Sequence, residues 1–369
     1  MSDLFFYGTL CHMPLLETVL GKPAVDINTI PAELPDHAVF WAAEGAFPVI
    51  VAQVGSTAPG IILRDLSDED VARLDFYEGG YDYVLAVKTL ADGTPADVYF
   101  PQVGAATPTH AWSLSDWVRD WGEMTCLAAI EAMTFSKTRT AKQIARMFPM
   151  IRARAAATLN AKHSKHGAGT LDGRVDIISK TRVYTDFFAV DRYDITHELF
   201  NGGTSAELDR AIFLSGDAAI VLPYDAVRDR VLVVEQFRMG PVGRGDPHAW
   251  QIEPIAGRID AGETGVQAAL REAKEEADLD ISMLEPVAEL YPSPGTSNEF
   301  YYLYVGLADL PDDIAGLNGL ATEHEDIRTH VMTLDALLDM VDNMQVANAP
   351  LVLLTYWVAR HRERLRALS

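Results

Sequence analysis

The chain has 369 residues, of which 49% are apolar and 22% charged, and its formal net charge is -23. This length predicts two or three domains of a globular protein. The negative charge opposes binding to nucleic acid and to anionic membrane surfaces, and no apolar run is long enough to span a membrane. Two distant cysteines, Cys11 and Cys126, indicate neither a disulfide framework nor a metal site. We therefore expect a cytoplasmic protein with no nucleic-acid and no membrane partner.

Residues 1–103 have the pattern of a small, strand-rich domain. A short apolar strand at 4–10 runs into a glycine turn, and apolar residues at helical spacing follow over 14–20. A second helix is expected after a Ser67 cap, because acidic residues fill its first turn. Aromatic and β-branched runs elsewhere in this segment predict further strands.

Three motifs in this segment are the Tyr7–Leu10 loop, Gly60 and the run Leu74–Gly79. Together they resemble the gamma-glutamylcyclotransferase-like family. The resemblance implies a β-rich barrel in which Glu78 is the general acid and base. It also implies that the loop amides bind a substrate carboxylate, through Tyr7, Gly8, Thr9 and Leu10. Such proteins often carry Tyr-x-Arg downstream, where this chain has Leu85 in place of the arginine, so a catalytic domain and a structural or dimerisation module both stay open.

Residues 104–174 are predicted to form a helical, basic connector. A possible Ser115 cap followed by apolar residues at helical intervals predicts a helix. Between Ser136 and His166 there are eight lysines and arginines and no acidic residue. This segment could bind nucleic acid, but aromatic residues for base stacking are almost absent from it. We favour a basic face that is solvated or meets the acidic surface of the protein itself.

Residues 175–369 are predicted to form a mixed sheet followed by a loop and a helix. The loop and helix carry the spacing G-x5-E-x7-R-E-x2-E-E, with its residues at Gly257, Glu263, Arg271, Glu272, Glu275 and Glu276. One turn separates the first and last glutamates of the helix, so three carboxylates project from one side. The opposite side is expected to face the sheet, through Val266, Ala269, Leu270, Ala273 and Ala277. Stacked like charges repel, and a hard divalent cation would compensate for them.

This spacing resembles the Nudix box of hydrolases that cleave a nucleoside diphosphate from a linked group. A solvated acidic helix would explain two of the glutamates but not the required offsets of Gly257, Glu263 and Arg271. The resemblance implies an α/β/α sandwich and a site for Mg²⁺ or Mn²⁺. Its implied ligands are Glu272 and Glu276, assisted by Glu275, and the carbonyl of Ala256. At Asp278, where glycine normally ends the helix, we expect a left-handed backbone.

A loop at Ser293–Glu299 resembles the marker of ADP-ribose pyrophosphatases, and other segments from Arg182 onwards match that subfamily in order. The resemblance implies a small nucleoside diphosphate substrate, namely ADP-ribose, cleaved to AMP and ribose 5-phosphate. It further implies an additional N-terminal sheet and a homodimer through the Nudix domain. The implied substrate-binding residues are Arg210, Arg238, Phe187, Phe188, Pro294 and Gly295. The implied catalytic carboxylates that activate water are Glu325, and as second choice Glu323.

The whole sequence is thus predicted to be an α+β multidomain protein with boundaries at 1–103, 104–174 and 175–369. Bacterial fusions of this kind resemble proteins labelled as tellurite-resistance determinants, a label that names a phenotype and no chemistry. Two alternatives to ADP-ribose hydrolysis stay open. One is a Nudix hydrolase of a nucleotide sugar or of NADH, and the other is a sensor that binds ADP-ribose without cleaving it.

Overall fold

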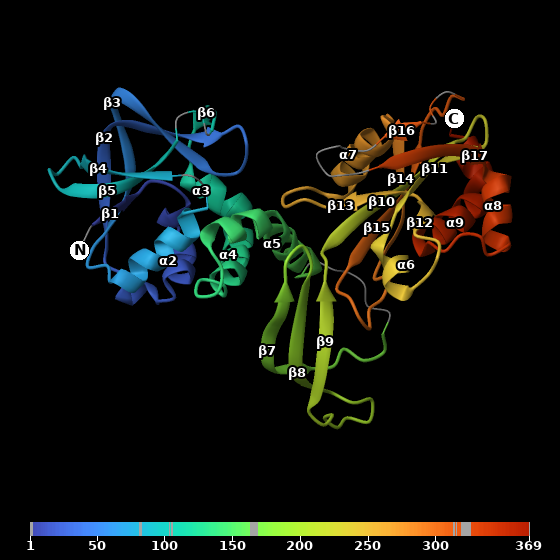
Figure 1. The fold of residues 1–369 in the computed structure, drawn as a ribbon, viewed down its shortest axis with the longest axis horizontal. Coiled ribbons are helices and arrows are strands. Elements are labelled where there is room, and N and C mark those ends of the chain that lie inside the picture. The colour runs from blue at the N-terminus through green and yellow to red at the C-terminus, as the bar shows by residue number, and fades with distance from the viewer. Residues whose placement is uncertain are drawn as a thin grey trace. The chain divides into compact units, whose positions relative to one another are not determined.

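The chain divides into two compact units, Met1–Ser164 and Lys165–Ser369. Figure 1 traces the first unit from blue to green and the second from green to red. No described helix is both long and apolar enough to cross a membrane. The computed structural model describes residues 3–80, 83–102, 104, 106–162, 169–312, 314, 316–318 and 326–368.

The first unit combines a six-stranded sheet with a group of helices. Its strands are β1 Leu4–Phe6, β2 Thr29–Ala42, β3 Pro48–Leu63, β4 Tyr83–Thr89, β5 Pro95–Pro101 and β6 Pro108–Ala111. Its α-helices are α1 Met13–Leu20, α2 Asp68–Glu78, α3 Leu114–Trp117, α4 Glu123–Met133 and α5 Ala141–Lys162. Two short 3-10 turns, η1 Thr9–Cys11 and η2 Ala24–Asp26, and a π-helical turn, η3 Val118–Gly122, complete it.

The strands of this sheet follow the order β4-β5-β1-β3-β2-β6. The hairpin of β2 and β3 is its longest pairing, and β1 lies antiparallel to β3 and parallel to β5. Alternate side chains of β1 enter different cores, because Phe5 packs with Ile62 whereas Leu4 packs with the apolar face of α1. The predicted strand-rich fold is confirmed, whereas the described pairings leave β4 and β6 as edges and do not close a barrel.

Two helix starts in this unit test the predicted caps. The Ser67 cap is confirmed, because its hydroxyl accepts a hydrogen bond from the Asp70 amide at 3.2 Å while the Asp70 carboxylate accepts from the Ser67 amide at 2.9 Å. The Ser115 cap is wrong. Ser113 caps α3 instead, accepting from the Asp116 amide at 3.2 Å, so the helix begins two residues earlier than its sequence pattern indicated.

The described part of the basic segment, residues 136–162, lies on the loop before α5 and on α5 itself. Several of its cations form ion pairs with acidic residues of the same unit: Lys137–Glu69 at 3.4 Å, Arg154–Glu131 at 2.5 Å and Lys162–Glu123 at 2.5 Å. Arg152 lies over the ring of Trp121 and Arg139 over that of Phe135. These contacts are those of a basic face that meets the protein's own acidic surface.

The second unit is built on an eight-stranded sheet with a smaller three-stranded sheet before it. Its strands are β7 Val175–Thr185, β8 Ala189–His197, β9 Leu208–Leu214, β10 Asp217–Asp225, β11 Arg230–Phe237, β12 Trp250–Glu253, β13 Ile255–Arg258, β14 Met283–Leu290, β15 Phe300–Leu307, β16 Leu317–Asn318 and β17 Ile327–Thr333. Its helices are α6 Met239–Arg244, α7 Gly265–Ala277, α8 Leu334–Asp342 and α9 Ala349–Arg366.

The large sheet separates two hydrophobic cores, as an α/β/α sandwich requires. Along β10, Leu222 and Tyr224 pack towards α8 and α9, whereas Val221 packs towards α7. The sheet follows the order β14-β15-β10-β11-β17-β16, with β12 paired to β11 and β13 to β10. This confirms the predicted sandwich. The β10–β13 pairing brings the strand before the box next to the centre of the sheet.

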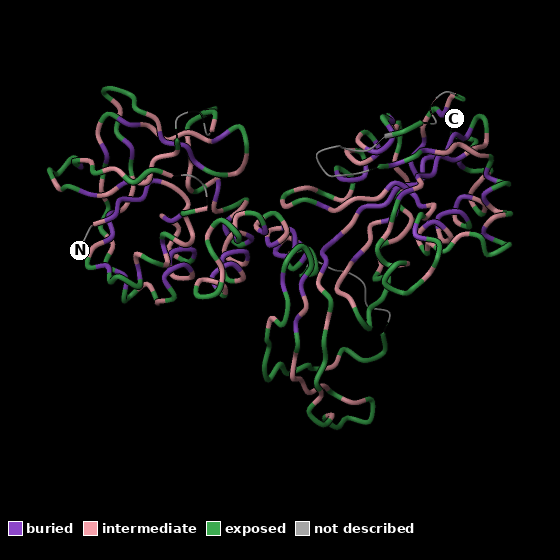
Figure 2. Tube along the Cα trace, in the orientation of Figure 1, coloured by how far each residue is buried: buried purple, intermediate pink, exposed green. Residues whose placement is uncertain are grey.

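The additional N-terminal sheet is confirmed as the antiparallel order β7-β8-β9. Figure 2 shows long exposed stretches on these strands, in contrast to the buried centre of the large sheet. The end of β9 is joined to the loop before β15, because the Phe213 amide donates to the Thr296 carbonyl at 2.9 Å. That junction holds the β7–β8 turn beside the Nudix-like sheet.

Candidate functional site

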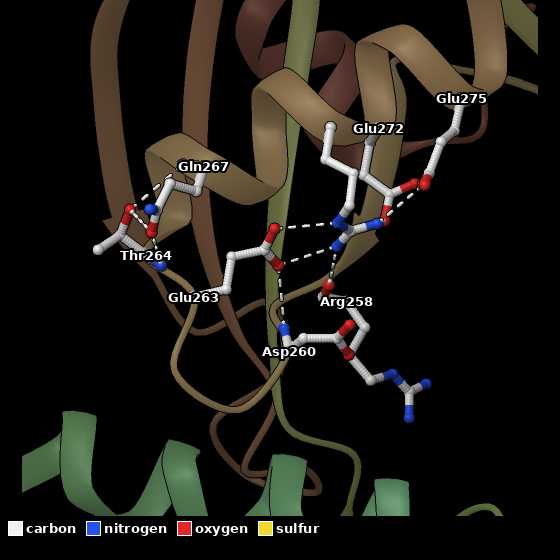
Figure 3. A network of polar contacts seen from close by, with 8 residues as sticks. Arg258, Asp260, Glu263, Thr264, Gln267, Glu272 and Glu275 are labelled. Carbon is white, nitrogen blue, oxygen red and sulfur yellow. Dashed lines mark hydrogen bonds and ion pairs between the residues drawn. The ribbon is translucent and has the colours of Figure 1, made fainter. Parts of the chain in front are cut away.

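The predicted box forms a loop followed by α7, whose start is fixed by a reciprocal cap. The Thr264 hydroxyl accepts from the Gln267 amide at 3.2 Å, and the Gln267 side chain accepts from the Thr264 amide at 2.8 Å. Figure 3 shows this cap at the end of the loop that carries Glu263. The helix ends at Asp278, whose backbone is left-handed with φ 48° and ψ 36°, which confirms the prediction for that position.

The apolar side of α7 differs in part from its prediction. The helix packs on the sheet through alanines at 268, 269, 273 and 277, all of them buried. Val266 and Leu270 are 46% and 40% exposed, so their assignment to the buried side is wrong. Small residues on the sheet side let the helix backbone approach the strands closely, while Val266 and Leu270 lie at the edge of that side. Glu276 is only 2% exposed, at the border between the two sides.

Arg271 is the centre of the charge network in the box. Its guanidinium binds Glu263 through two hydrogen bonds of 2.9 Å, and it also reaches Glu272 at 2.7 Å and Glu275 at 2.9 Å. A further hydrogen bond of 3.0 Å runs to the carbonyl of Arg258 (Figure 3). Ion pairing holds the pKa of Glu263 below its usual range despite partial burial. One arginine thus contacts three carboxylates, offsets part of their charge, and holds the backbone before the loop.

Two box glutamates lie against the backbone of Ala256 and Gly257. A Cβ on Gly257 would lie 1.7 Å from Oε1 of Glu272, so only glycine leaves room for that carboxylate. The Glu276 carboxylate accepts a hydrogen bond of 3.4 Å from the Ala256 amide. The structure therefore brings together the carboxylates and the main-chain segment that were predicted to hold a metal ion.

Within the described part of the chain, no group of three His, Cys, Asp or Glu side chains is arranged to hold a metal ion. The reason is visible in the network, since Glu272 and Glu275 turn towards Arg271. The donor set nevertheless suits a hard divalent cation, because the carboxylate of Glu272 lies against Gly257 and that of Glu276 lies against Ala256, which places two oxygen-donor side chains on one backbone segment.

A cavity of about 290 Å³ adjoins this backbone segment, and both Ala256 and Gly257 line it. The other lining residues include two arginines, three carboxylates and an aromatic ring: Arg238, Arg258, Asp217, Glu253, Glu299 and Phe188. A cavity of about this size with convergent charged groups suits a small polar ligand.

Arg238 enters the cavity just after β11, as a substrate-binding residue must. Its guanidinium pairs with Glu253, through Nη2 at 2.7 Å and Nε at 2.9 Å from Oε2. Glu253 was not singled out from the sequence; it lies on β12 opposite Val234 of β11, and the arginine side chain reaches back along the strand pair to it. The nearly buried carboxylate positions the arginine and offsets its charge.

Of the other residues predicted for this site, some line the cavity and others lie outside its lining. Phe188 lines the cavity, and Phe187 lies beside it at the β7–β8 turn. Arg210 lies on β9, where its guanidinium donates to the Asp209 carbonyl at 2.8 Å, and it is not among the residues that line the cavity. Pro294 and Gly295 are exposed in the loop before β15. Glu323 and Glu325 lie outside the described residues.

The first unit holds a second candidate site around Glu78 at the end of α2. Burial raises the pKa of Glu78 to about 7 and that of Tyr7 well above its usual range, and charge on Glu78 raises the Tyr7 pKa further. The Tyr7 hydroxyl donates to the Tyr99 carbonyl at 2.9 Å, which fixes the start of the Tyr7–Leu10 loop. Gly8 and Gly60 are tightly enclosed, since a Cβ would lie 2.6 Å from Pro48 and 2.1 Å from the Phe6 carbonyl.

The first 103 residues contain only four lysines and arginines. Each has a described partner away from Glu78: Lys22 with Asp70, Arg64 with Asp3, Arg73 with the Val19 carbonyl, and Lys88 over the Phe100 ring. None of these four contacts places a cation beside Glu78, which suits the predicted binding of a substrate carboxylate by the amides of the Tyr7–Leu10 loop.

Comparison with known proteins agrees with this architecture. Residues 214–354 match the family described as NUDIX domain, and residues 4–119 match the family described as Gamma-glutamyl cyclotransferase, AIG2-like. The sandwich, the box and the adjoining cavity are those of a Nudix hydrolase, and the chain belongs to that family. Its first unit contains a gamma-glutamylcyclotransferase-like domain. Both resemblances seen in the sequence are confirmed.

The chain is similar to proteins named ADP-ribose pyrophosphatase and GDP-mannose pyrophosphatase. The chain is 38% identical over 192 residues to the ADP-ribose pyrophosphatase of Escherichia coli K12, a match that spans 52% of this chain and 91% of the relative. The ADP-ribose pyrophosphatase of Haemophilus influenzae is 31% identical over 194 residues, which are 52% of this chain and 89% of that protein. The GDP-mannose pyrophosphatase of Cronobacter sakazakii is 29% identical over 182 residues, 49% of this chain and 92% of the relative.

Proposed function

We propose that this protein hydrolyses the diphosphate of ADP-ribose to AMP and ribose 5-phosphate. The observation that carries the proposal is the cavity, because one space is lined by Arg238, by Phe188 and by the backbone against which Glu272 and Glu276 lie. An anion, an aromatic nucleobase and a divalent cation would each find a suitable partner there. The ADP-ribose pyrophosphatases among the relatives support this substrate over others.

Nudix hydrolases generally use a divalent metal ion, and we assign Mg²⁺ here, with Mn²⁺ as its substitute. Such an ion supplies charge neutralisation at the reacting phosphate and lowers the pKa of water. Glu272 and Glu276 would hold it with the Ala256 carbonyl, and Glu275 would assist from the next position of α7. Arg238 orients the diphosphate, with its own geometry set by the bond to Glu253.

Other residues keep their predicted roles as part of the proposal. Glu325, with Glu323 as second choice, activates the attacking water. Pro294 and Gly295 form the substrate loop, while Arg210 would contact the diphosphate. The structure supports Phe188 over Phe187 as the ring that stacks on adenine, because Phe188 lines the cavity.

We also propose a cytoplasmic homodimer formed through the three-stranded sheet. Large apolar side chains on this sheet and the turn after β8 are exposed in the single chain: Val175, Ile177, Ile178, Val183, Tyr184 and Phe200 are between 56% and 87% exposed. A second copy could cover them, and an exchange of these strands could bring Arg210 of one copy towards the other. Sedimentation equilibrium tests this, and a monomer at micromolar concentration would reject it. The divisions 1–103, 104–174 and 175–369 stay our proposal for the functional boundaries.

The decisive experiment is a substrate panel of ADP-ribose, a nucleotide sugar and NADH with Mg²⁺, assayed for nucleoside monophosphate. We expect the highest kcat/KM for ADP-ribose, and loss of AMP release in Glu276→Gln. Preference for another substrate would leave a Nudix hydrolase of different specificity. Tight binding of ADP-ribose with no turnover would establish the sensor in place of the enzyme. An unaltered rate in Glu276→Gln would reject the assigned metal ligands.

A second candidate function, gamma-glutamyl cyclotransfer by the first unit, is favoured by the pKa of about 7 at Glu78. A carboxyl group that titrates near neutrality can both donate and accept a proton at the operating pH. The expected result is release of 5-oxoproline from gamma-glutamyl peptides by the wild type and its loss in Glu78→Gln. If the wild type releases none, this domain is a structural or dimerisation module.

A further inference from the structure

Tyr99 lies between the two parts of the candidate site in the first unit. It is on β5, the strand that runs parallel to β1, and the Tyr7–Leu10 loop begins directly after β1. Its neighbour Val98 is buried in one core with Phe5, so the Tyr99 side chain turns to the opposite face of the sheet. There its ring stacks on that of Phe6, with the centroids 6.0 Å apart. This face carries the core to which α1 and α2 contribute.

Two hydrogen bonds of Tyr99 join the loop to the helix that carries Glu78. Its main-chain carbonyl accepts from the Tyr7 hydroxyl at 2.9 Å. Its own hydroxyl donates to Oδ1 of Asp75 at 2.5 Å, a distance within the range of charge-assisted bonds. Asp75 precedes Glu78 by three residues on α2, so the two positions are neighbours on one side of the helix. One residue of β5 thus holds both elements of the site.

Glu78 lies close to the hydroxyls of both tyrosines. Burial raises the pKa of Tyr7 and that of Tyr99, and in both cases charge on Glu78 raises the pKa further. Burial also raises the pKa of Glu78 itself to about 7. A movement of α2 that admits water to this carboxyl would therefore lower its pKa towards 4.5.

The helix α5 packs against the chain directly after Glu78. A Cβ on Gly80 would lie 2.7 Å from the Cβ of Ala145 and 3.0 Å from the carbonyl oxygen of Ala141. This close contact between small residues fixes how far the end of α2 lies from α5. Apolar packing has little directional preference, whereas a hydrogen bond requires its donor and acceptor to be aligned. The bond from Tyr99 to Asp75 can therefore set the rotation of α2 about its axis, and with it the direction of Glu78.

We propose that Tyr99 is a positioning residue, whose hydroxyl holds α2 at Asp75 so that Glu78 faces the Tyr7–Leu10 loop. The proposal rests on the second candidate function, gamma-glutamyl cyclotransfer, and deepens it by assigning a residue that aligns the acid and base. A group that transfers a proton must lie within hydrogen-bond reach of it. A rotated α2 would therefore leave the domain folded and Glu78 ineffective.

A carbon-13 NMR titration of the Glu78 carboxyl in the full chain tests the proposal without a substrate, with Glu78→Gln to identify the signal. The wild-type carboxyl should titrate near pH 7. Tyr99→Phe removes the hydroxyl but keeps the ring and the carbonyl, and it should move the midpoint towards 4.5 because water then reaches Glu78. An unchanged midpoint in Tyr99→Phe would overturn the proposal. A wild-type midpoint near 4.5 would overturn it too, since Glu78 would be open to water with Tyr99 in place.

Two neutral substitutions of Asp75 separate the hydrogen bond from the charge. Asp75→Asn keeps an oxygen that accepts from Tyr99 and should retain the wild-type midpoint. Asp75→Leu has a similar size but no acceptor, so it should shift the midpoint as Tyr99→Phe does. The double variant Tyr99→Phe, Asp75→Leu should shift it no further than either single change. Equal midpoints in Asp75→Asn and Asp75→Leu, or additive shifts in the double variant, would overturn the role of Tyr99.

Asp68→Leu is the matched control for an apolar substitution on α2. Asp68 is exposed on the first turn of the helix, and its replacement should leave the midpoint of Glu78 unchanged. A shift as large as that of Asp75→Leu would assign the effect to α2 as a whole and refute the role of Tyr99. Melting temperatures identify variants that fail to fold, and if Tyr99→Phe fails, the comparison of Asp75→Asn with Asp75→Leu decides.

Release of 5-oxoproline from gamma-glutamyl peptides separates this proposal from the function on which it rests. Tyr99→Phe should lower kcat about tenfold or more and change KM little, because the acid and base is misaligned while the loop amides still bind. A higher KM with unchanged kcat would place Tyr99 in substrate binding and reject the positioning role. If the wild type releases none but the midpoints move as expected, the cyclotransferase function fails and the positioning of Glu78 stands. If it releases 5-oxoproline and Tyr99→Phe leaves the midpoint unchanged, the function stands and the proposal fails.

Discussion

Replacing Gly257 by alanine is the most direct test of the geometry in the box. The backbone at this glycine is not left-handed, so alanine can adopt it. The obstacle is the Glu272 side chain, because the new Cβ would lie 1.7 Å from its Oε1 and 1.9 Å from its Cδ. To reach ordinary contact at 3.4 Å, the carboxylate must retreat by about 1.7 Å.

The expected loss of stability is the sum of two costs that this retreat of the Glu272 carboxylate causes. A shifted rotamer costs about 0.5–1.5 kcal/mol. Loss of the partly exposed contact with Arg271 costs about 0.2–1 kcal/mol after solvent screening. The free energy of unfolding of Gly257→Ala should therefore be lower by about 1–2 kcal/mol. A catalytic group misplaced by this distance costs about 100-fold in rate, so activity should fall far more than stability.

The assay compares kcat/KM for ADP-ribose, its dependence on divalent cation concentration, and the melting temperature. Gly243→Ala on α6 is the control, because its Cβ would meet nothing within 4 Å and its backbone is not left-handed either. Shortening Glu272 to aspartate in the Gly257→Ala protein should recover part of the lost rate. A Gly257→Ala enzyme with wild-type kcat/KM and unchanged cation dependence would refute the assigned arrangement.

Three further predictions follow from single contacts. Burial raises the pKa of Glu78 above its unfolded value of 4.5, so the folded state binds this proton more tightly than the unfolded state. The contribution of Glu78 to the free energy of unfolding is therefore full below pH 4.5 and falls by up to about 1.4 kcal/mol per pH unit towards pH 7. Urea unfolding at several pH values should show this fall in the wild type and lack it in Glu78→Gln. Asp278→Gly relieves a left-handed aspartate and should raise stability by about 0.5–1 kcal/mol, and a lower melting temperature would contradict this. Arg238→Lys removes the two-pronged guanidinium that Glu253 orients, so KM for ADP-ribose should rise about tenfold while kcat changes less. An unchanged KM would show that Arg238 does not bind the substrate.

The parts of the site that could be predicted are those encoded within one helix and its cap. Glu272 and Glu276 are one turn apart on any α-helix, and the left-handed Asp278 follows from how helices end. The same rule failed for Val266 and Leu270, which are exposed although apolar, because hydrophobicity alone does not tell how closely a helix approaches a sheet. Alanines on the sheet side set that approach.

Contacts between distant strands could not be predicted in the same way. The pair Arg238–Glu253 depends on the register of β11 against β12, and a shift of one residue would turn one partner to the other face. The contact between Arg258 and Phe187 requires in addition that the β7–β8 turn reaches the cavity, which depends on the junction at Phe213. No local pattern carries either piece of information.

Arg271 of the second unit links the carboxylates of the box to the backbone of the neighbouring strand. Arg271 forms hydrogen bonds with three carboxylates of the box, and a further hydrogen bond holds the carbonyl of Arg258. One hydrogen-bond network therefore fixes the position of Glu272, a proposed metal ligand, and of the backbone at Arg258, which lines the cavity. Loss of Arg271 should consequently disturb the proposed metal ligands and the backbone of β13 together. This shared support gives a physical reason why the arginine of the box must stand at a fixed offset from Gly257.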